Sequence, residues 1–178
     1  MKNTFFYAIL ISFSLMTAGC GYVFGPFQDE RSFSEYRSDA AITASIKSKL
    51  MGEKISKTFD VSVYCFDGNV YLVGAADNTF RQRAEGIAHK EEGVKSVTAK
   101  WFPVGASSVN DVALAAKINA ILLGTSNVTS NQVSVEVIGG NVVLLGKMYG
   151  PEEIDRTLSA VRNTKGVKTI TNYLIAAY

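Results

Sequence analysis

Residues 68–74 read Gly-Asn-Val-Tyr-Leu-Val-Gly and residues 140–146 read Gly-Asn-Val-Val-Leu-Leu-Gly, so one short motif occurs twice, 72 positions apart. Each motif opens inside a two-residue turn, Asp67-Gly68 in the first case and Gly139-Gly140 in the second. Such turns tolerate positive φ and typically join the strands of a β-hairpin. Because apolar residues alternate after each turn, each motif predicts a hairpin strand with one buried face.

The repeat extends on both sides of these motifs, which is the signature of a duplicated structural unit. Upstream, an aspartate is followed by apolar residues at every fourth position, which indicates a helix. Downstream come a second helical stripe and a shared Gly-Val-Lys sequence before a last strand. The matched sets are Asp39, Ile42, Ile46 and Leu50 with Asp111, Leu114, Ile118 and Leu122; Val61 and Val63 with Val133 and Val135; and Gly93, Val94 and Lys95 with Gly166, Val167 and Lys168.

Each unit therefore has the order α-β-β-α-β, and the fold class is α+β. The turns pair Val63 with Leu72 and Cys65 with Val70, and the second unit pairs in the same way. Because a strand–helix–strand crossover normally joins parallel strands, we expect a three-stranded mixed sheet with both helices on one face. The predicted domains are residues 39–102 and 110–178, joined by a linker at 103–109.

Local signals predict where the helices of these units begin and end. Ser38 or Asp39 and Asn110 or Asp111 are candidate caps of the two first helices, and Asp77 or Asn78 of the second helix of the first unit. Pro151 belongs in the first turn of the corresponding helix in the second unit. Gly93 and Gly166 are candidate left-handed C-terminal caps.

The first 20 residues predict export from the cytoplasm. Lys2 precedes an apolar run at 5–16 that is shorter than the ~20 residues needed to cross a bilayer. Small residues then lead to Cys20, which resembles the lipidated cysteine of a bacterial lipobox, although Thr17 stands where that motif usually has leucine. We expect a lipoprotein signal peptide at 1–19 and a lipidated tether at 20–38; an ordinary cleaved signal is the alternative.

Composition excludes several classes of function. Lys and Arg number 18 against 16 Asp and Glu, so the chain lacks the basic excess of a nucleic-acid-binding protein. Two cysteines and one histidine form no metal-binding cluster, and we expect no metal, no cofactor and no small-molecule substrate. Cys65 is expected to be buried and His89 to be an ordinary surface residue. No carboxylate pair or nucleophile arrangement predicts an enzyme.

Together, the Asp-x-x-Ile, Val-x-Val, Gly-x-Val-x-Leu-x-Gly and Gly-Val-x-x-Val elements resemble the BON domain family. With the signal peptide and Cys20, the layout is similar to that of the dual-BON outer-membrane lipoproteins of the DolP type. The resemblance implies palmitate-type acylation, attachment to the outer membrane facing the periplasm, association with anionic phospholipid, a role in envelope integrity and no catalysis. A protein-interaction module that uses its lipid only as an anchor is the alternative; a small-ligand binder between the domains is a weaker one.

Two surfaces are candidates for contact with a membrane or a partner. The helix predicted over 112–123 is apolar nearly all round, unlike a surface helix with one apolar side. Its residues outside the inner stripe are Ala113, Ala116, Lys117, Ala120, Ile121 and Leu123. The second candidate is the sheet face turned away from the helices, unless the other domain covers it. That face carries Tyr64, Phe66, Tyr71, Ile138, Val143 and Leu145.

Overall fold

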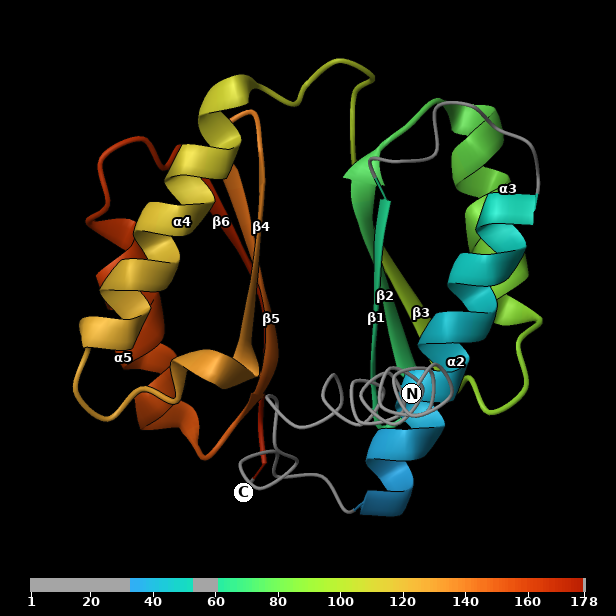
Figure 1. Cartoon of the computed structure of the whole chain (residues 1–178), viewed down its shortest axis with the longest axis horizontal. Helices are drawn as coiled ribbons and strands as arrows, with labels where there is room; N and C mark the ends of the chain where they lie inside the picture. The colour runs from blue at the N-terminus through green and yellow to red at the C-terminus, as the bar shows by residue number, and fades with distance from the viewer. Residues whose placement is uncertain (1–32, 53–60, 178) are drawn as a thin grey trace, which may run out of the picture.

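A computed structural model describes residues 33–52 and 61–177, and Figure 1 shows that they form two domains of the same design. Cys20 and the predicted signal peptide lie outside the described residues. The first domain comprises α2 (Phe33–Gly52), β1 (Val61–Phe66), β2 (Asn69–Ala75), α3 (Asn78–His89) and β3 (Ser96–Phe102). The second comprises α4 (Val109–Gly124), a 3₁₀ turn η3 (Ser130–Gln132), β4 (Val133–Ile138), β5 (Asn141–Met148), α5 (Pro151–Arg162) and β6 (Thr169–Ala176).

Each domain contains the predicted three-stranded mixed sheet. The central strand, β2 or β5, runs antiparallel to the strand before it and parallel to the last strand. Val63 pairs with Leu72 and Cys65 with Val70, as the turn chemistry predicts. In each domain the paired apolar residues join the inner stripes of both helices in one core, so both helices lie on one face of the sheet.

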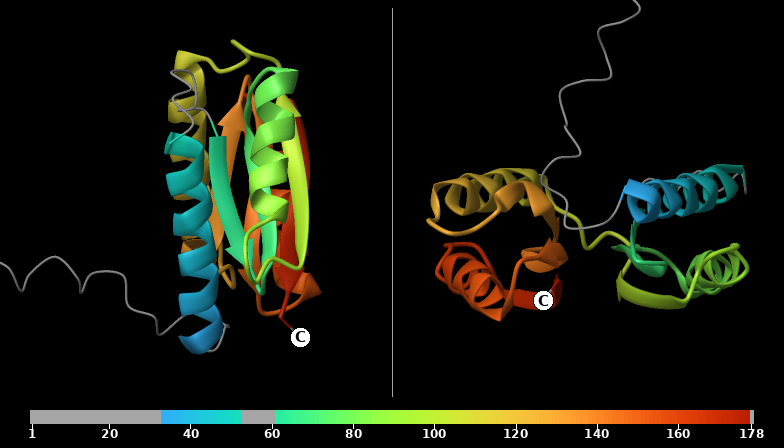
Figure 2. Two further views of the ribbon diagram at one scale, coloured as in Figure 1. Left: turned by 90° about the vertical axis from the view of Figure 1, so that its right-hand side faces the viewer. Right: turned by 90° about the horizontal axis from the view of Figure 1, so that it is seen from below.

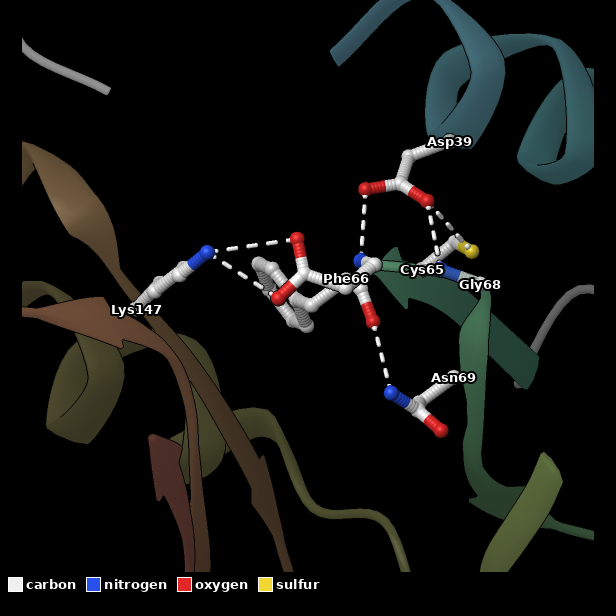
Figure 3. Close-up of polar contacts among 7 residues, drawn as sticks. Asp39, Cys65, Phe66, Gly68, Asn69 and Lys147 are labelled. Carbon is white, nitrogen blue, oxygen red and sulfur yellow. Dashed lines mark hydrogen bonds and ion pairs between the residues drawn. The ribbon is translucent and has the colours of Figure 1, made fainter. Parts of the chain in front are cut away.

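A buried aspartate joins the first helix of each domain to the hairpin turn. The Asp39 carboxylate accepts hydrogen bonds from the backbone N–H groups of Asp67 (2.8 Å) and Gly68 (2.9 Å), as Figure 3 shows. Asp111 binds the N–H groups of Gly139 (2.7 Å) and Gly140 (3.0 Å) in the same way. The repeated aspartate therefore holds the hairpin turn and does not begin the helix.

Several expected helix boundaries are corrected by the structure. Helix α2 begins at Phe33, inside the region 20–38 expected to be a tether, so neither Ser38 nor Asp39 caps it. The cap of α4 is Ser108, whose backbone N–H binds Asp111 in a capping box. Asp77 and Pro151 occupy the predicted positions at the starts of α3 and α5.

Gly93 and Gly166 are left-handed, with φ of 84° and 110°, but they are not C-terminal caps. They lie in the loops that follow Lys90 and Asn163, which are the C-cap residues of α3 and α5. Each glycine lies against the first helix of its domain, where a Cβ atom would be 3.2 Å from Ile42 or 3.4 Å from Leu114. Close approach as well as backbone conformation therefore favours glycine at these positions.

The sheet faces turned away from the helices pack against each other and form a third core between the domains. Val143 and Leu145 of β5 are fully buried there, together with Val73 of β2 at 1% exposure. The rings of Tyr71 and Tyr173 meet across the interface at a tilt of 42°, with centroids 5.4 Å apart. Lys147 of β5 forms a 3.0 Å ion pair with Asp67 in the β1–β2 turn, which Figure 3 also shows.

The two domains are related by an approximate two-fold axis. The Tyr64 hydroxyl donates a hydrogen bond to the Glu136 carboxylate, and these residues occupy equivalent positions in the two repeats, 72 residues apart. Strands β1 and β4 are equivalent in the two repeats, and so are β2 and β5. The contact of β1 with β5 and that of β2 with β4 are therefore the same contact, made twice across the axis. The two sheets therefore form the middle of the molecule, with α2 and α3 outside the first sheet and α4 and α5 outside the second, as Figures 1 and 2 show.

The buried carboxylate of Asp111 predicts a test of the turn. Asp111→Asn should lower the free energy of unfolding by about 1.5–3 kcal/mol at pH 7, because backbone donors lose a charged acceptor. Asp155→Asn, on the exposed side of α5, should change it by no more than about 0.5 kcal/mol. Urea denaturation measures both values, and equal losses would contradict the role assigned to Asp111.

The same pair of proteins tests the pH dependence. Burial acts to raise the pKa of Asp111, but hydrogen bonds from the N–H groups of Ser108, Gly139 and Gly140 outweigh it and hold the pKa below its usual value. Its stabilisation is therefore complete above the unfolded pKa of about 3.9 and is lost as pH falls through the lower folded pKa. The stability difference between wild type and Asp111→Asn should shrink over that range; a difference that stays constant into acid would contradict this explanation.

The interdomain core predicts a contrast between two leucines. Leu145→Ala should lower the free energy of unfolding by about 2–5 kcal/mol, because it leaves a cavity between the sheets. Leu123→Ala should cost no more than about 0.5 kcal/mol, because that side chain is 77% exposed. Thermal or urea unfolding distinguishes them, and a small loss for Leu145→Ala would indicate that the sheets do not pack in solution.

Candidate functional site

Helix α4 exposes a continuous apolar strip on the outside of the second domain. Val109 is 91% exposed, and Val112 and Leu123 are each 77% exposed. Three exposed alanines fill the turns between them. At 100° per residue all these side chains fall on one side of the helix. We define the α4 strip as Val109, Val112, Ala113, Ala116, Ala120 and Leu123.

The opposite side of α4 is fixed firmly to the domain, so the strip is held in place. Ile118 and Leu122 are fully buried in the core of the second domain, and Leu114 packs against it. The Ser108 capping box and the Asp111 contacts with the β4–β5 turn fix the start of the helix. The apolar strip is therefore presented on a rigid element, without any rearrangement of the core.

The predicted contact residues of α4 agree with this surface except for one. Ala113, Ala116, Lys117, Ala120 and Leu123 are exposed, whereas Ile121 is half-buried. Lys117 is at the edge of the strip, and its Nζ atom lies 3.5 Å from the carbonyl oxygen of Lys165.

Sequence reasoning missed the two most exposed valines of the strip. The predicted linker at 103–109 contains Val109, and the predicted contacts do not include Val112. The spacing of Val109, Val112 and Ala113 continues the strip upstream by one turn. That signal was present in the sequence, but it appears only when Ser108 is taken as the cap.

The equivalent surface of α2 is different, although the two helices have the same place in their domains. Positions that correspond to Ala120 and Leu123 are occupied by Ser48 and Met51, and Lys47 corresponds to Asn119. Met51 is 70% exposed, but Lys47, Ser48 and Lys49 are also exposed beside it. Only α4 therefore carries an uninterrupted apolar strip among the described positions of these two helices.

The second candidate surface is not available for outside contact. Phe66, Ile138, Val143 and Leu145 are at least nine-tenths buried between the two sheets, and Tyr64 and Tyr71 pack against them. The physical reason is that each sheet has two apolar faces and each domain has helices for only one of them. The other face is covered by the other domain.

Two tyrosines of the first domain lie at this interface, and the Tyr64 hydroxyl donates a hydrogen bond across it to Glu136. Burial raises the pKa of the Tyr64 phenol, and the nearby Glu136 carboxylate raises it further. Burial also raises the pKa of Tyr71, with a smaller contribution from Tyr173. Both phenols therefore stay neutral at physiological pH, and Tyr64 acts as a hydrogen-bond donor that fixes the register of the sheets.

Cys65 and His89 lie in different surroundings. The buried Cys65 thiol lies 3.1 Å from an oxygen of Asp39, and His89 is exposed on α3. Within residues 33–52 and 61–177, His, Cys, Asp and Glu form no group of three that could hold a metal ion. Over the same ranges, no helix has the length and apolar character needed to cross a bilayer.

Comparisons with known proteins agree with this fold. The chain is 32% identical over 146 residues to the osmotically inducible protein Y of Escherichia coli (strain K12), covering 78% of this chain and 73% of that protein. It is 29% identical over 116 residues to a 21 kDa hemolysin of Actinobacillus pleuropneumoniae, covering 62% and 59% of the two chains.

A weaker likeness links the chain to a solved structure of CdsD, a structural protein of the type III secretion system of Chlamydia trachomatis. Sequence identity is 12% and the TM-score is 0.33, with 75% of this chain and 62% of CdsD covered. That likeness is too low to carry a functional argument. The model of the BON domain matches twice, over residues 38–100 and 110–177, and each match coincides with one of the two domains. The chain therefore belongs to the BON domain family.

Proposed function

We propose that this chain is a non-enzymatic, lipid-anchored envelope protein of the DolP type that docks on anionic phospholipid bilayers through α4. The observation that carries this proposal is the exposed α4 strip, with valine or leucine at both ends and alanine between. Because the apolar sheet faces are buried against each other, they do not compete with α4 for the role.

The strip has the properties of an interfacial contact. Fully burying a valine or leucine side chain contributes roughly 1.5–3 kcal/mol, so three such residues give a useful but limited affinity. Because alanine side chains are small, the helix backbone can come close to the bilayer surface. Because the strip carries no tryptophan or other large aromatic residue, we expect shallow contact with the headgroup region, with depth limited by the helix itself.

A lipid on Cys20 would supply the remaining affinity. The 12 residues between Cys20 and Phe33 span at most about 40 Å, which keeps both domains close to the membrane that holds the lipid. Docking of α4 then becomes an intramolecular event with a high effective concentration. In this proposal the acyl chains retain the protein at the outer membrane, facing the periplasm, and α4 sets its orientation there.

A role in envelope stress is consistent with the name of the relative from Escherichia coli, an osmotically inducible protein. The competing hypothesis is a module that binds an envelope protein and uses its lipid only as an anchor. The two hypotheses differ in one respect that can be measured, namely whether the protein without its lipid binds protein-free vesicles.

Vesicle flotation of the mature chain with Cys20→Ser, which cannot be lipidated, tests the proposal. Wild-type domains should float with vesicles that contain phosphatidylglycerol. Ala120→Glu combined with Leu123→Glu should abolish flotation, because it places two carboxylates in the strip next to an anionic surface.

The matched control is Ser48→Glu combined with Met51→Glu, the same change at the equivalent positions of α2. It should leave flotation within about twofold of wild type, and circular dichroism should show that both variants are folded. Undiminished flotation of the α4 variant would eliminate the α4 strip as the docking surface. No flotation of any form would favour the protein-binding module.

A further inference from the structure

A cleft lined by three lysines lies beside the α4 strip. It has a volume of about 490 Å³ and is formed where the start of α4, the β4–β5 turn and the loop after α5 meet. Lys117 reaches it from α4, and Lys165 and Lys168 from the loop. Its apolar part includes Ala113 and Leu114, and Ala113 also belongs to the α4 strip, so the cleft and the strip are continuous.

The local backbone holds these lysines around the cleft. Lys168 donates its backbone N–H to Gly140 (2.9 Å), and its side chain runs over that turn, where a Cβ on Gly140 would lie 3.3 Å from it. Lys117 Nζ lies near the Lys165 carbonyl, on the same loop. The only carboxylate in the lining, Asp111, is buried and already accepts hydrogen bonds from three backbone N–H groups.

No carboxylate among the described residues makes an ion pair with any of the three lysines. Three exposed cations around one cleft raise the local positive potential, which attracts an anion. The cleft thus combines three exposed lysines with an apolar part. A ligand that combines a phosphate with an apolar group would match both parts.

The first domain supplies an internal comparison. Its residues at the positions of Lys117, Lys165 and Lys168 are Ser45, Glu92 and Lys95, so one lysine is replaced by a neutral residue and one by an acid. Glu91 nearby also pairs with Lys49 at 2.6 Å. Since the same fold forms with these residues, the fold does not require the lysines of the second domain.

We propose that Lys117, Lys165 and Lys168 bind the phosphate of an anionic phospholipid headgroup while the α4 strip contacts the lipid beside it. This inference rests on the proposed function and adds the site that selects anionic lipid. It assigns the apolar contact to the α4 strip and the charge selectivity to Lys117 together with the loop between α5 and β6. Removing the lysines should therefore abolish selectivity and leave the apolar contribution.

The test exchanges the cleft residues for those of the first domain, in the mature chain with Cys20→Ser. Lys117→Ser combined with Lys165→Glu removes three units of positive charge. At about 1 kcal/mol, or roughly fivefold in affinity, for each unit near an anionic surface, binding to phosphatidylglycerol-containing vesicles should weaken about a hundredfold. Residual binding to phosphatidylcholine vesicles should stay within about twofold of wild type, and thermal unfolding should show that the fold is retained.

A control with the same change of charge separates the cleft from general electrostatic attraction. Lys47→Ser combined with Lys90→Glu removes three units from exposed positions of the first domain. It should weaken binding to anionic vesicles no more than about threefold, and an effect equal to that of the cleft variant would overturn the proposal.

Inorganic phosphate distinguishes a lipid site from a site for a soluble anion. At 10 mM it should not displace the wild-type protein from anionic vesicles more than chloride of equal ionic strength does. Saturable phosphate binding at the lysines, together with unchanged vesicle binding of the cleft variant, would overturn the lipid assignment. If the wild type binds no vesicle, the proposed function is overturned as well. If the α4 variant loses vesicle binding but the cleft variant does not, only the role assigned to the cleft lysines is overturned.

Discussion

The packing of one sheet against the other is the constraint on which the rest of the structure depends. Each domain has helices for one sheet face only, and the second face is apolar in both. Val143 and Leu145 are fully buried between the sheets, and the Tyr64–Glu136 hydrogen bond fixes how they meet. Because this interface is internal, the helices are the outer layer, and the apolar sheet faces are not available for contact with another molecule.

Duplication explains why one helix could acquire such a contact. The two domains need the same internal residues, namely the turn-binding aspartates and the paired apolar positions of the strands. Outside these positions they have diverged, and Ser48 and Met51 of α2 correspond to Ala120 and Leu123 of α4. The first domain thus completes the shared interdomain core, while the second provides the surface for which we propose a function.

Much of the fold could be predicted because it depends on local patterns. The turn at Asp67-Gly68 fixes which residues pair across the hairpin, and the alternation of apolar residues fixes which face is buried, so fold and register followed from the sequence.

Helix starts were less predictable, because Asp39 and Asp111 resemble caps but bind a turn that is 28 residues away. Whether the sheet faces turned away from the helices are covered depends on contacts between residues that are distant in the sequence. The sequence alone therefore allowed either exposed or covered faces. The contact residues of α4 could be found from periodicity, whereas the cleft could not, because Lys117 and Lys165 come together only when α4 meets the loop after α5.

Amide line broadening in NMR spectra, recorded with vesicles that contain phosphatidylglycerol and a spin-labelled lipid, identifies the residues that lie at the bilayer surface. Val109–Gly124 and the loop at 165–168 should broaden, with the strands of both sheets unaffected. Broadening that is strongest on α3 or β3, or spread evenly over both domains, would contradict the claim that α4 is the surface that meets the membrane.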